Sequence, residues 1–256
     1  MIETRFHRLP DGRRIAHRFA EGAGPVLVFL PGYKSDMTGS KAAALFDHAR
    51  ASGRAGLLLD YSGCGESSGS FADGTLSRWK EEVLAVIAAR CPGRELVLVG
   101  SSMGGWLMLL VARALGAGLK ALVGIAAAPD FTDWGFDPAQ KALLATGETL
   151  YEDNPYGPEP TPTHAGFWAD GQANRLLGGE IALTCPVRLL QGQRDEDVPW
   201  QTALALAAAL RSDDVQVVLI KDGDHRLSRE ADIATLLRTV DALYAELLTG
   251  AATKDA

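Results

Sequence analysis

The chain has 256 residues, 47% of them hydrophobic and 22% charged, which is the composition of an ordinary soluble globular protein. Its formal net charge of −7 and its scattered Lys and Arg side chains argue against a nucleic-acid partner, because phosphate contacts need clustered basic residues. No apolar stretch approaches the roughly 20 residues that cross a bilayer, and the N-terminal sequence MIETRFHRLP predicts neither a signal nor a transit peptide.

The first elements in chain order are short strand-like segments. Residues 4–9 and 13–20 flank Pro-Asp-Gly, a turn signal, and predict an opening β-hairpin. The runs that follow are mostly continuous in apolar residues, as expected for strands covered on both faces of a mostly parallel sheet. These runs are residues 25–30, 56–60, 95–100, 121–128, 186–192 and 215–220. The sequence therefore predicts a central sheet of about eight strands.

Helical patterns alternate with these runs. Residues 76–90 and 231–248 each place their apolar side chains on one face of a helix, whereas residues 103–115 are apolar nearly all round, which indicates a buried helix. Strands that alternate with such helices predict an α/β fold, in which ligands bind at the carboxyl ends of the strands. We expect the whole chain, 1–256, to form a single domain of this class.

One segment, residues 131–179, interrupts this alternation because it contains no convincing core strand. Connections of this length in compact α/β domains are usually lids or binding loops, so we expect a lid inserted over the carboxyl edge of the sheet. Its aromatic side chains are predicted either to line a pocket or to form a small core of the lid itself. They are Trp134, Phe136, Tyr151, Tyr156, Phe167 and Trp168.

The sequence LVGSSMGGW, residues 98–106, places two serines between glycines where a predicted strand meets the buried helix. A turn this tight strains its middle residue and presses the residues two before and two after against neighbouring backbone. Around Ser102 those residues are Gly100 and Gly104. Around Ser101 they are valine and methionine, whose side chains would clash. We therefore predict that Ser102 is the nucleophile and that Ser101 has a supporting hydrogen-bonding role.

A serine hydroxyl needs a neighbouring base, usually histidine, to react near neutral pH. His225 follows the last predicted strand by a few residues, where a loop returns to the carboxyl edge of the sheet, and is the predicted base. His164, in the inserted segment, is the alternative. The other histidines lie in the opening hairpin or at the end of a helix after the third strand, and are His7, His17 and His48.

The third group must be a carboxylate that orients the imidazole and stabilises its charged form. The sequence QRDEDVPW follows a predicted strand and offers several acids. Asp195 is nearest to the strand end and is the predicted acid, with Asp197 and Asp130, at the end of a neighbouring strand, as alternatives. The chain order Ser102, Asp195, His225 is the order expected of this type of fold.

Backbone N–H groups are expected to stabilise the oxyanion that forms when the serine attacks a carbonyl. The N–H of Met103 follows the nucleophile directly. In the loop after the third strand, Gly32 permits close backbone approach and the N–H of Tyr33 is the second predicted donor, with a plain glycine turn as the alternative. The loop DYSGCGESSG, residues 60–69, lacks the Lys of a phosphate-binding loop and is interpreted as a brace for the nucleophile turn.

Neither a metal nor a cofactor is predicted. His225 and Asp195 are too few to form a ligand set, and the chain has no H-E-x-x-H sequence. Three cysteines without C-x-x-C spacing indicate buried thiols in a reducing compartment, so we expect a cytoplasmic protein. These cysteines are Cys64, Cys91 and Cys185.

Five ordered motifs resemble the α/β-hydrolase superfamily over roughly residues 25–245. They are PGYKSDMTGSKA, DYSGCGESSG, VGSSMGGWLM, CPVRLLQG with DEDVPW, and DHRLSREADI. Within the superfamily they look like the branch of mitochondrial palmitoyl-protein thioesterases that also act as acyl-glucuronide esterases. The inserted segment is least similar, so the resemblance implies the reaction class better than the substrate. It makes Ser102, Asp195 and His225 the counterparts of a catalytic triad, and Tyr33 and Met103 those of an oxyanion hole.

Together these residues predict a cofactor-free serine hydrolase that cleaves carboxylic esters or thioesters through an acyl-enzyme on Ser102. The expected substrate is a small-molecule or lipidated acyl ester or thioester, while the acyl length, the leaving group and the oligomeric state stay undefined. A peptidase or amidase on the same scaffold is one alternative, although the insertion offers no obvious paired acids for the charged end of a peptide. A non-catalytic ligand-binding protein is the other, and the presence of all three triad residues disfavours it.

Overall fold

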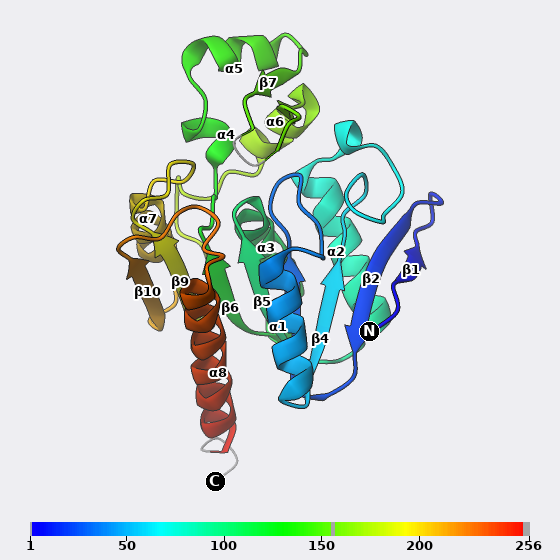
Figure 1. Ribbon diagram of the computed structural model, residues 1–256, viewed down its shortest axis with the longest axis vertical. Helices are drawn as coiled ribbons and strands as arrows, with labels where there is room; N and C mark the ends of the chain where they lie inside the picture. Colours follow the sequence, from blue (N-terminus) through cyan, green and yellow to red (C-terminus); the bar gives the residue numbers. More distant parts are fainter. Residues whose placement is uncertain (1, 155–156, 253–256) are drawn as a thin grey trace.

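An eight-stranded sheet forms the centre of the computed structural model, which describes residues 2–154 and 157–252 (Figure 1). The strand order is β1-β2-β4-β3-β5-β6-β9-β10. Strands β4, β3, β5, β6, β9 and β10 pair in parallel, and β2 pairs antiparallel with both β1 and β4. The strands are β1 (Arg5–Arg8), β2 (Arg14–Ala20), β3 (Ala23–Leu30), β4 (Arg54–Leu59), β5 (Leu96–Ser101), β6 (Leu119–Ile125), β9 (Val187–Gly192) and β10 (Val215–Ile220). The predicted fold class is confirmed.

The continuous apolar runs explain why the central strands lie inside the molecule. Strand β5 is buried along its whole length. Its successive side chains point to opposite faces, so that Leu98 packs into one hydrophobic core and Val99 into the core on the other side of the sheet. A strand with apolar residues at every position is stable here because helices cover both faces.

Helices of two groups cover these faces. Helices α1 (Ser40–Ala51) and α8 (Glu230–Ala252) pack together over one face and lie in front of the sheet in Figure 1. Helices α2 (Leu76–Arg90), α3 (Met103–Leu115) and α7 (Gln201–Ala209) contribute to the core on the other face. In α3 all residues from Met103 to Ala112 are buried, as the apolar composition of this helix predicts. Short 3-10 helices occupy Phe71–Asp73 and Gly116–Gly118.

Residues 131–179, here called the cap, lie beyond one end of the main sheet (Figure 1). The cap contains α4 (Phe131–Trp134), α5 (Pro138–Ala145), β7 (Leu150–Glu152), β8 (Thr161–Thr163) and α6 (Ala165–Ala173), and β7 and β8 form a separate antiparallel pair. It has a small core of its own around Phe136, Leu144 and Leu150, against which Trp168 packs. Tyr156, one of the aromatic residues of this segment, lies outside the described residues.

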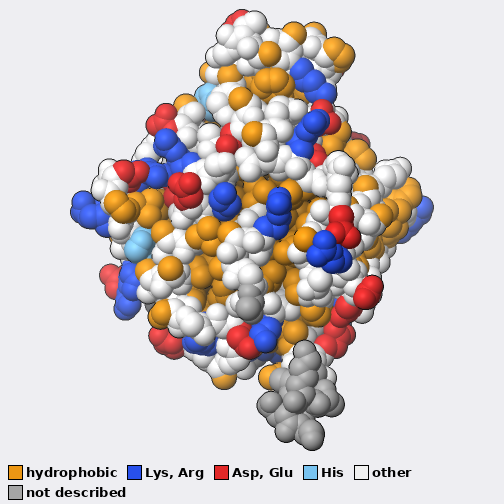
Figure 2. Space-filling model, turned by 180° about the vertical axis from the view of Figure 1, so that it is seen from behind, with side chains coloured by type: hydrophobic (Ala, Val, Ile, Leu, Met, Phe, Trp, Pro, Cys, Tyr) orange, Lys and Arg blue, Asp and Glu red, His pale blue; other side chains and the backbone are white. Residues whose placement is uncertain are grey.

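In residues 2–154 and 157–252, none of the helices combines the length and the apolar content that crossing a bilayer requires. Seen from behind, hydrophobic side chains lie across the middle of the molecule, with basic and acidic side chains interspersed around them (Figure 2). Neither sign of charge dominates this face, which agrees with the scattered charges of the sequence.

Candidate active site

The turn between β5 and α3 carries Ser102 at its tip. Ser102 has φ 55° and ψ −123°, a backbone conformation that residues other than glycine rarely adopt. Three backbone hydrogen bonds hold Ser102 in this conformation. Its N–H donates to the carbonyl of Ile125 (2.9 Å), and its carbonyl accepts from the N–H groups of Gly105 (2.8 Å) and Ala128 (3.1 Å). The turn is therefore fixed to strand β6 as well as to its own helix.

The glycines two residues to either side of Ser102 are required by close backbone contacts. A Cβ atom on Gly100 would lie 2.3 Å from the carbonyl oxygen of Gly104. A Cβ atom on Gly104 would lie 2.2 Å from the carbonyl oxygen of Leu30 and 2.3 Å from that of Pro31. Because backbone atoms cannot move aside as a flexible side chain can, the helix approaches the sheet this closely only with glycine at both positions.

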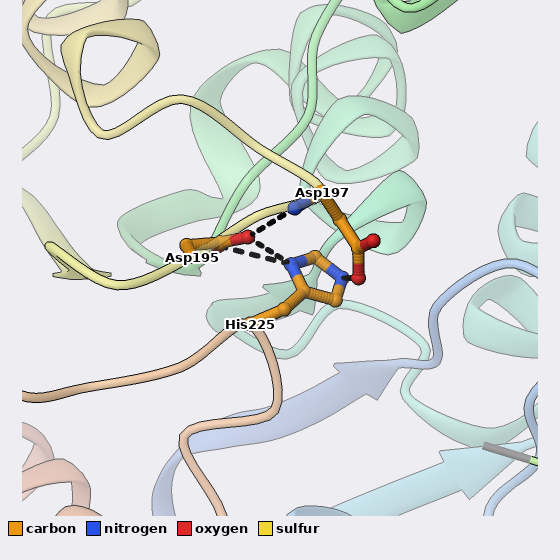
Figure 3. A group of neighbouring side chains, drawn as sticks. All are labelled: Asp195, Asp197 and His225. Carbon is orange, nitrogen blue, oxygen red and sulfur yellow. Dashed lines mark hydrogen bonds and ion pairs between the residues drawn. The ribbon is translucent and has the colours of Figure 1, made fainter. Parts of the chain in front are cut away.

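The loops after β9 and β10 bring an acid and an imidazole to Ser102. The Nε2 atom of His225 lies 3.1 Å from Ser102 Oγ. The Nδ1 atom of His225 lies 3.1 Å from Oδ1 and 3.0 Å from Oδ2 of Asp195 (Figure 3). With the proton assigned to Nδ1, His225 donates to Asp195 and its Nε2 accepts from the serine hydroxyl. This is the geometry needed to remove a proton from the serine.

The carboxylate of Asp195 is held by donors on several sides, and its side chain is fully buried. Its Oδ1 accepts from the backbone N–H groups of Asp197 (3.0 Å) and Val198 (2.8 Å). Its Oδ2 accepts from the side-chain amide of Gln191 at 2.8 Å. Sequence reasoning did not single out Gln191, because a glutamine at the end of an apolar strand belongs to no motif.

Asp197, the alternative acid, lies on the opposite side of the imidazole (Figure 3). Its Oδ2 is 3.9 Å from Nε2 of His225, and its side chain is 44% exposed. Asp195, Asp197 and His225 offer ligand atoms within 4.8 Å of one another, which is close enough to consider a metal ion. The N–H groups of Gln191, Val198 and Asp197 already point at the Asp195 oxygens, and this arrangement fits a hydrogen-bonded acid better than a metal ligand.

The two predicted oxyanion donors, the N–H groups of Tyr33 and Met103, belong to backbone segments close to Ser102. Met103 is the first residue of α3, where N–H groups have no partner within the helix. A Cβ atom on Gly32 would lie 3.4 Å from Cβ of Ser102, so the backbone that leads into Tyr33 passes close to Ser102. Among the described residues, neither the Tyr33 nor the Met103 N–H donates to another protein group.

The loop at residues 60–69 braces the loop that carries Tyr33. The buried carboxylate of Asp60 accepts from the N–H of Met37 at 2.7 Å and from that of Glu66 at 2.9 Å. Tyr61 donates its hydroxyl to the carbonyl of Pro31 at 3.0 Å. Burial raises the pKa of Asp60. The loop thus supports the oxyanion side of the site through the residues on both sides of Tyr33.

The other acid and base considered from the sequence lie in different surroundings. Asp130 accepts from the N–H groups of Leu176 (2.8 Å) and Leu177 (2.7 Å), and burial raises its pKa. It therefore ties the two ends of the cap together. His164 lies within the cap, with Nδ1 3.0 Å from Oγ1 of Thr149. The remaining histidines are in β1, in β2 and at the end of α1, where His48 contacts Asp241; they are His7, His17 and His48.

A cavity of about 710 Å³ opens next to Ser102, which is within the range of small-molecule sites. One wall comes from the turn and the base of the cap and is apolar. It is formed by Met103, Ala128, Phe131, Trp134 and Phe136. The polar wall comes from the loops after β3, β9 and β10, from the start of α1 and from the β7–β8 part of the cap. It includes Lys34, Ser35, Asp36, Ser40, Lys41, Glu152, Asp153, Asn154, Thr161, Thr163, Glu196, Asp197, Arg226 and Ser228.

Residues 27–247, which include all of these groups, match the family model described as Alpha/beta hydrolase family. The chain belongs to this family. Palmitoyl-protein thioesterase ABHD10, mitochondrial, from Mus musculus is 40% identical over 243 residues, 92% of this hydrolase and 80% of that protein. The solved putative hydrolase from Agrobacterium vitis S4 is 41% identical, with a TM-score of 0.88, covering 95% of this chain and 99% of that one. Alpha/beta hydrolase domain-containing protein 10 from mouse is 35% identical, with the same TM-score, covering 96% and 99%.

The predicted resemblance is thereby confirmed, but the predicted location of this hydrolase is wrong. The mouse, rat and human relatives are each named as mitochondrial, which contradicts a cytoplasmic assignment. The cysteines that suggested it are free in the structure, and two of them, Cys64 and Cys91, are buried. Free thiols indicate a reducing environment, and they carry no signal that distinguishes one reducing compartment from another.

Proposed function

We propose that the chain hydrolyses acyl thioesters and carboxylic esters through a covalent acyl-enzyme on Ser102. The observation that carries the proposal is the continuous hydrogen-bonded path from Ser102 Oγ through His225 to Asp195, beside a cavity with an apolar wall. The names of the mammalian relatives support the acyl thioester as a substrate, since they are palmitoyl-protein thioesterases. The hydrolase class predicted from the sequence agrees with these names.

In the first half of the reaction, Ser102 Oγ attacks the acyl carbonyl carbon while His225 Nε2 takes the hydroxyl proton. The imidazolium that forms is stabilised by the buried carboxylate of Asp195, 3.0 Å from Nδ1. The negative charge on the carbonyl oxygen is stabilised by the N–H groups of Tyr33 and Met103. The tetrahedral intermediate then expels the thiol or alcohol, which receives its proton from His225, and the acyl group stays on Ser102.

In the second half, His225 takes a proton from a water molecule that attacks the acyl-enzyme carbonyl. The same two N–H groups stabilise the second oxyanion. Collapse of this intermediate releases the carboxylic acid and returns the proton to Ser102. The cap forms the roof over the acyl group, because Phe131, Trp134 and Phe136 face the cavity from it.

Substitution of Ser102 by alanine tests the proposal. We expect Ser102→Ala to lower kcat for acyl esters by about 10⁴–10⁶-fold, as for nucleophile loss in a triad, and to abolish labelling by a fluorophosphonate probe. Hydrolysis of a p-nitrophenyl ester and an acyl thioester, together with the matching anilide, measures the effect and compares esterase with amidase activity.

The neighbouring serine provides the matched control. Ser101 also lines the cavity but has no contact with the imidazole among the described residues. Ser101→Ala should retain probe labelling and stay within about tenfold of the parent activity. A tenfold or smaller loss in Ser102→Ala, or equal losses in both variants, would show that the nucleophile is misassigned.

A further inference from the structure

The position of the acyl chain follows from the two walls of the cavity, given the proposed function. The apolar wall begins at Met103 and Ala128, next to Ser102, and continues along the cap through Phe131 to Trp134. The polar wall contains charged groups of both signs, including Lys41 and Asp197. Burying methylene groups is favourable only against the first wall. The acyl chain therefore extends toward the base of the cap, and the leaving group toward the polar loops.

A second cavity of about 700 Å³ is lined by residues at both ends of the cap and by Arg113 of α3. Its lining is mixed: an apolar part around Leu176, Leu177 and Ile181 lies beside charged and polar side chains of both signs, and the stems of two arginines also contribute. Its residues are Arg113, Asp130, Asp133, Trp134, Gln172, Ala173, Arg175, Leu176, Leu177, Gly178, Gly179, Glu180 and Ile181. Among the described residues, Trp134 is the one that lines both this cavity and the cavity beside Ser102.

Trp134 is held in place between the two cavities. It is the last residue of α4, and its indole N–H donates to the carbonyl of Pro129 at 2.8 Å. Pro129 directly follows Ala128, whose N–H is bonded to the carbonyl of Ser102. The indole is thus fixed relative to Ser102, and Trp134 lines both cavities.

We infer that Trp134 sets the length of the acyl chain that the enzyme accepts. Its indole separates the cavity beside Ser102 from the second cavity. With the indole in place, an acyl chain ends against its ring. Without the indole, the two cavities are continuous, and further methylene groups reach the apolar part of the second one. This part includes Leu176 and Ile181, both buried.

The inference is tested with Trp134→Ala and a series of p-nitrophenyl esters with acyl chains of about 4 to about 18 carbons. Each methylene moved from water into an apolar cavity is worth about fourfold in affinity. We expect the chain length with the highest kcat/KM to become longer in the variant. The ratio of kcat/KM for chains beyond the parent optimum to that for chains at the optimum should rise about tenfold or more.

Trp168→Ala is the matched control. Trp168 lies in the same cap, is half-buried like Trp134, and donates its indole N–H to the carbonyl of Thr132 at 3.0 Å. It lines neither cavity. If loosening of the cap altered the chain-length preference, this variant would show it. We expect Trp168→Ala to keep the parent optimum even where its thermal stability falls.

Trp134→Phe, which keeps an aromatic ring, guards against misfolding of the alanine variant and should move the optimum less. An unchanged optimum in folded Trp134→Ala, or in Trp134→Phe where the alanine variant does not fold, overturns the inference, and so does an equal shift in Trp168→Ala. Failure of the proposed function is distinguishable, because it would appear as ester hydrolysis that persists in Ser102→Ala. The preference for acyl-chain length is therefore calculated only from the activity that Ser102→Ala abolishes.

Discussion

Gln191 is the residue whose position adds most to the account of the candidate site. Its side chain is buried at the end of β9, and its amide Nε2 donates to Oδ2 of Asp195 (2.8 Å) and to the carbonyl of Val198 (3.2 Å). In the proposed mechanism, Asp195 keeps its negative charge and its orientation while the imidazole of His225 is protonated. A buried donor that faces the carboxylate serves both needs, because it stabilises the charged form and limits rotation of the side chain.

Gln191→Met removes this donor with little change in volume. A hydrogen bond to a charged group contributes about 1.5–3 kcal/mol, so kcat for ester hydrolysis should fall about 10-fold to 100-fold. The KM should change little, because Gln191 does not line the cavity. Steady-state kinetics and a thermal melt measure the two effects together. An unchanged kcat in a folded variant would mean that the backbone N–H groups of Asp197 and Val198 suffice to hold Asp195.

The candidate catalytic residues could be predicted from the sequence because their signals are local. The G-x-S-x-G spacing reflects a steric requirement of one turn, and Asp195 and His225 each follow an apolar run within a few residues. Gln191 could not be predicted in the same way. Its significance comes from a side-chain orientation that depends on how the loop after β9 folds back over the strand end.

At the scale of elements, Tyr33 connects the candidate oxyanion loop to the cap. Its hydroxyl donates to the carbonyl of Pro162 in β8 at 2.9 Å, and its ring packs against Phe131 and Phe167 of the cap at 6.1 and 4.8 Å between centroids. Burial raises the pKa of Tyr33, so the hydroxyl stays protonated and able to donate. The residue proposed to supply an oxyanion N–H therefore also holds the cap through its side chain.

Tyr33→Phe separates these two contributions, since it removes the hydroxyl and keeps the backbone N–H and the ring. Loss of a hydrogen bond of this kind costs about 0.5–1.5 kcal/mol, and here the cost is expected in the cap. Amide hydrogen exchange of β7 and β8 should become faster, while kcat for a short ester stays within about threefold. Exchange measured by mass spectrometry provides the comparison. Unchanged exchange in β8 would show that the ring contacts alone hold the cap.

The elements of the cap were the least predictable from sequence. Strands β7 and β8 have three residues each, too few for an alternating pattern to be recognised, and they pair with each other rather than with the main sheet. The strands of the main sheet were predictable because they are buried on both faces and hence apolar throughout. Where packing on a large sheet does not dictate composition, as in the segment around Pro162, the sequence pattern carries less information.

For the whole molecule, one buried histidine outside the candidate site couples folding to pH. His17 is fully buried in β2, and its Nε2 has no hydrogen-bond partner among the described residues. Its Nδ1 lies 3.3 Å from the carbonyl oxygen of Ile15. Burial lowers the pKa of His17, and the positive charge of Arg90, with smaller effects from His7 and Arg5, lowers it further. His17 is therefore neutral in the folded protein near pH 7.

This lowered pKa predicts a loss of stability in acid. Below the ordinary histidine pKa of about 6.5, the unfolded chain binds a proton at His17 that the folded protein does not bind. Stability rises with pH wherever the unfolded state holds more protons, so acidification from about pH 6.5 toward the lowered folded pKa destabilises the fold. Burial also raises the pKa of Glu82, so the contribution of His17 has to be separated from that of other groups.

A comparison of the parent with His17→Leu isolates the contribution of His17, because the substitution replaces the titrating group with an apolar side chain. Urea unfolding midpoints at pH 7 and pH 5 are compared for the parent and the variant. Between these two pH values the parent should lose more stability than His17→Leu. This holds whatever the difference in stability between the two proteins at pH 7. His48→Leu, which replaces a half-buried histidine beside Asp241, serves as the control. Equal acid-dependent losses in the parent and His17→Leu would show that His17 does not set the acid limit of the fold.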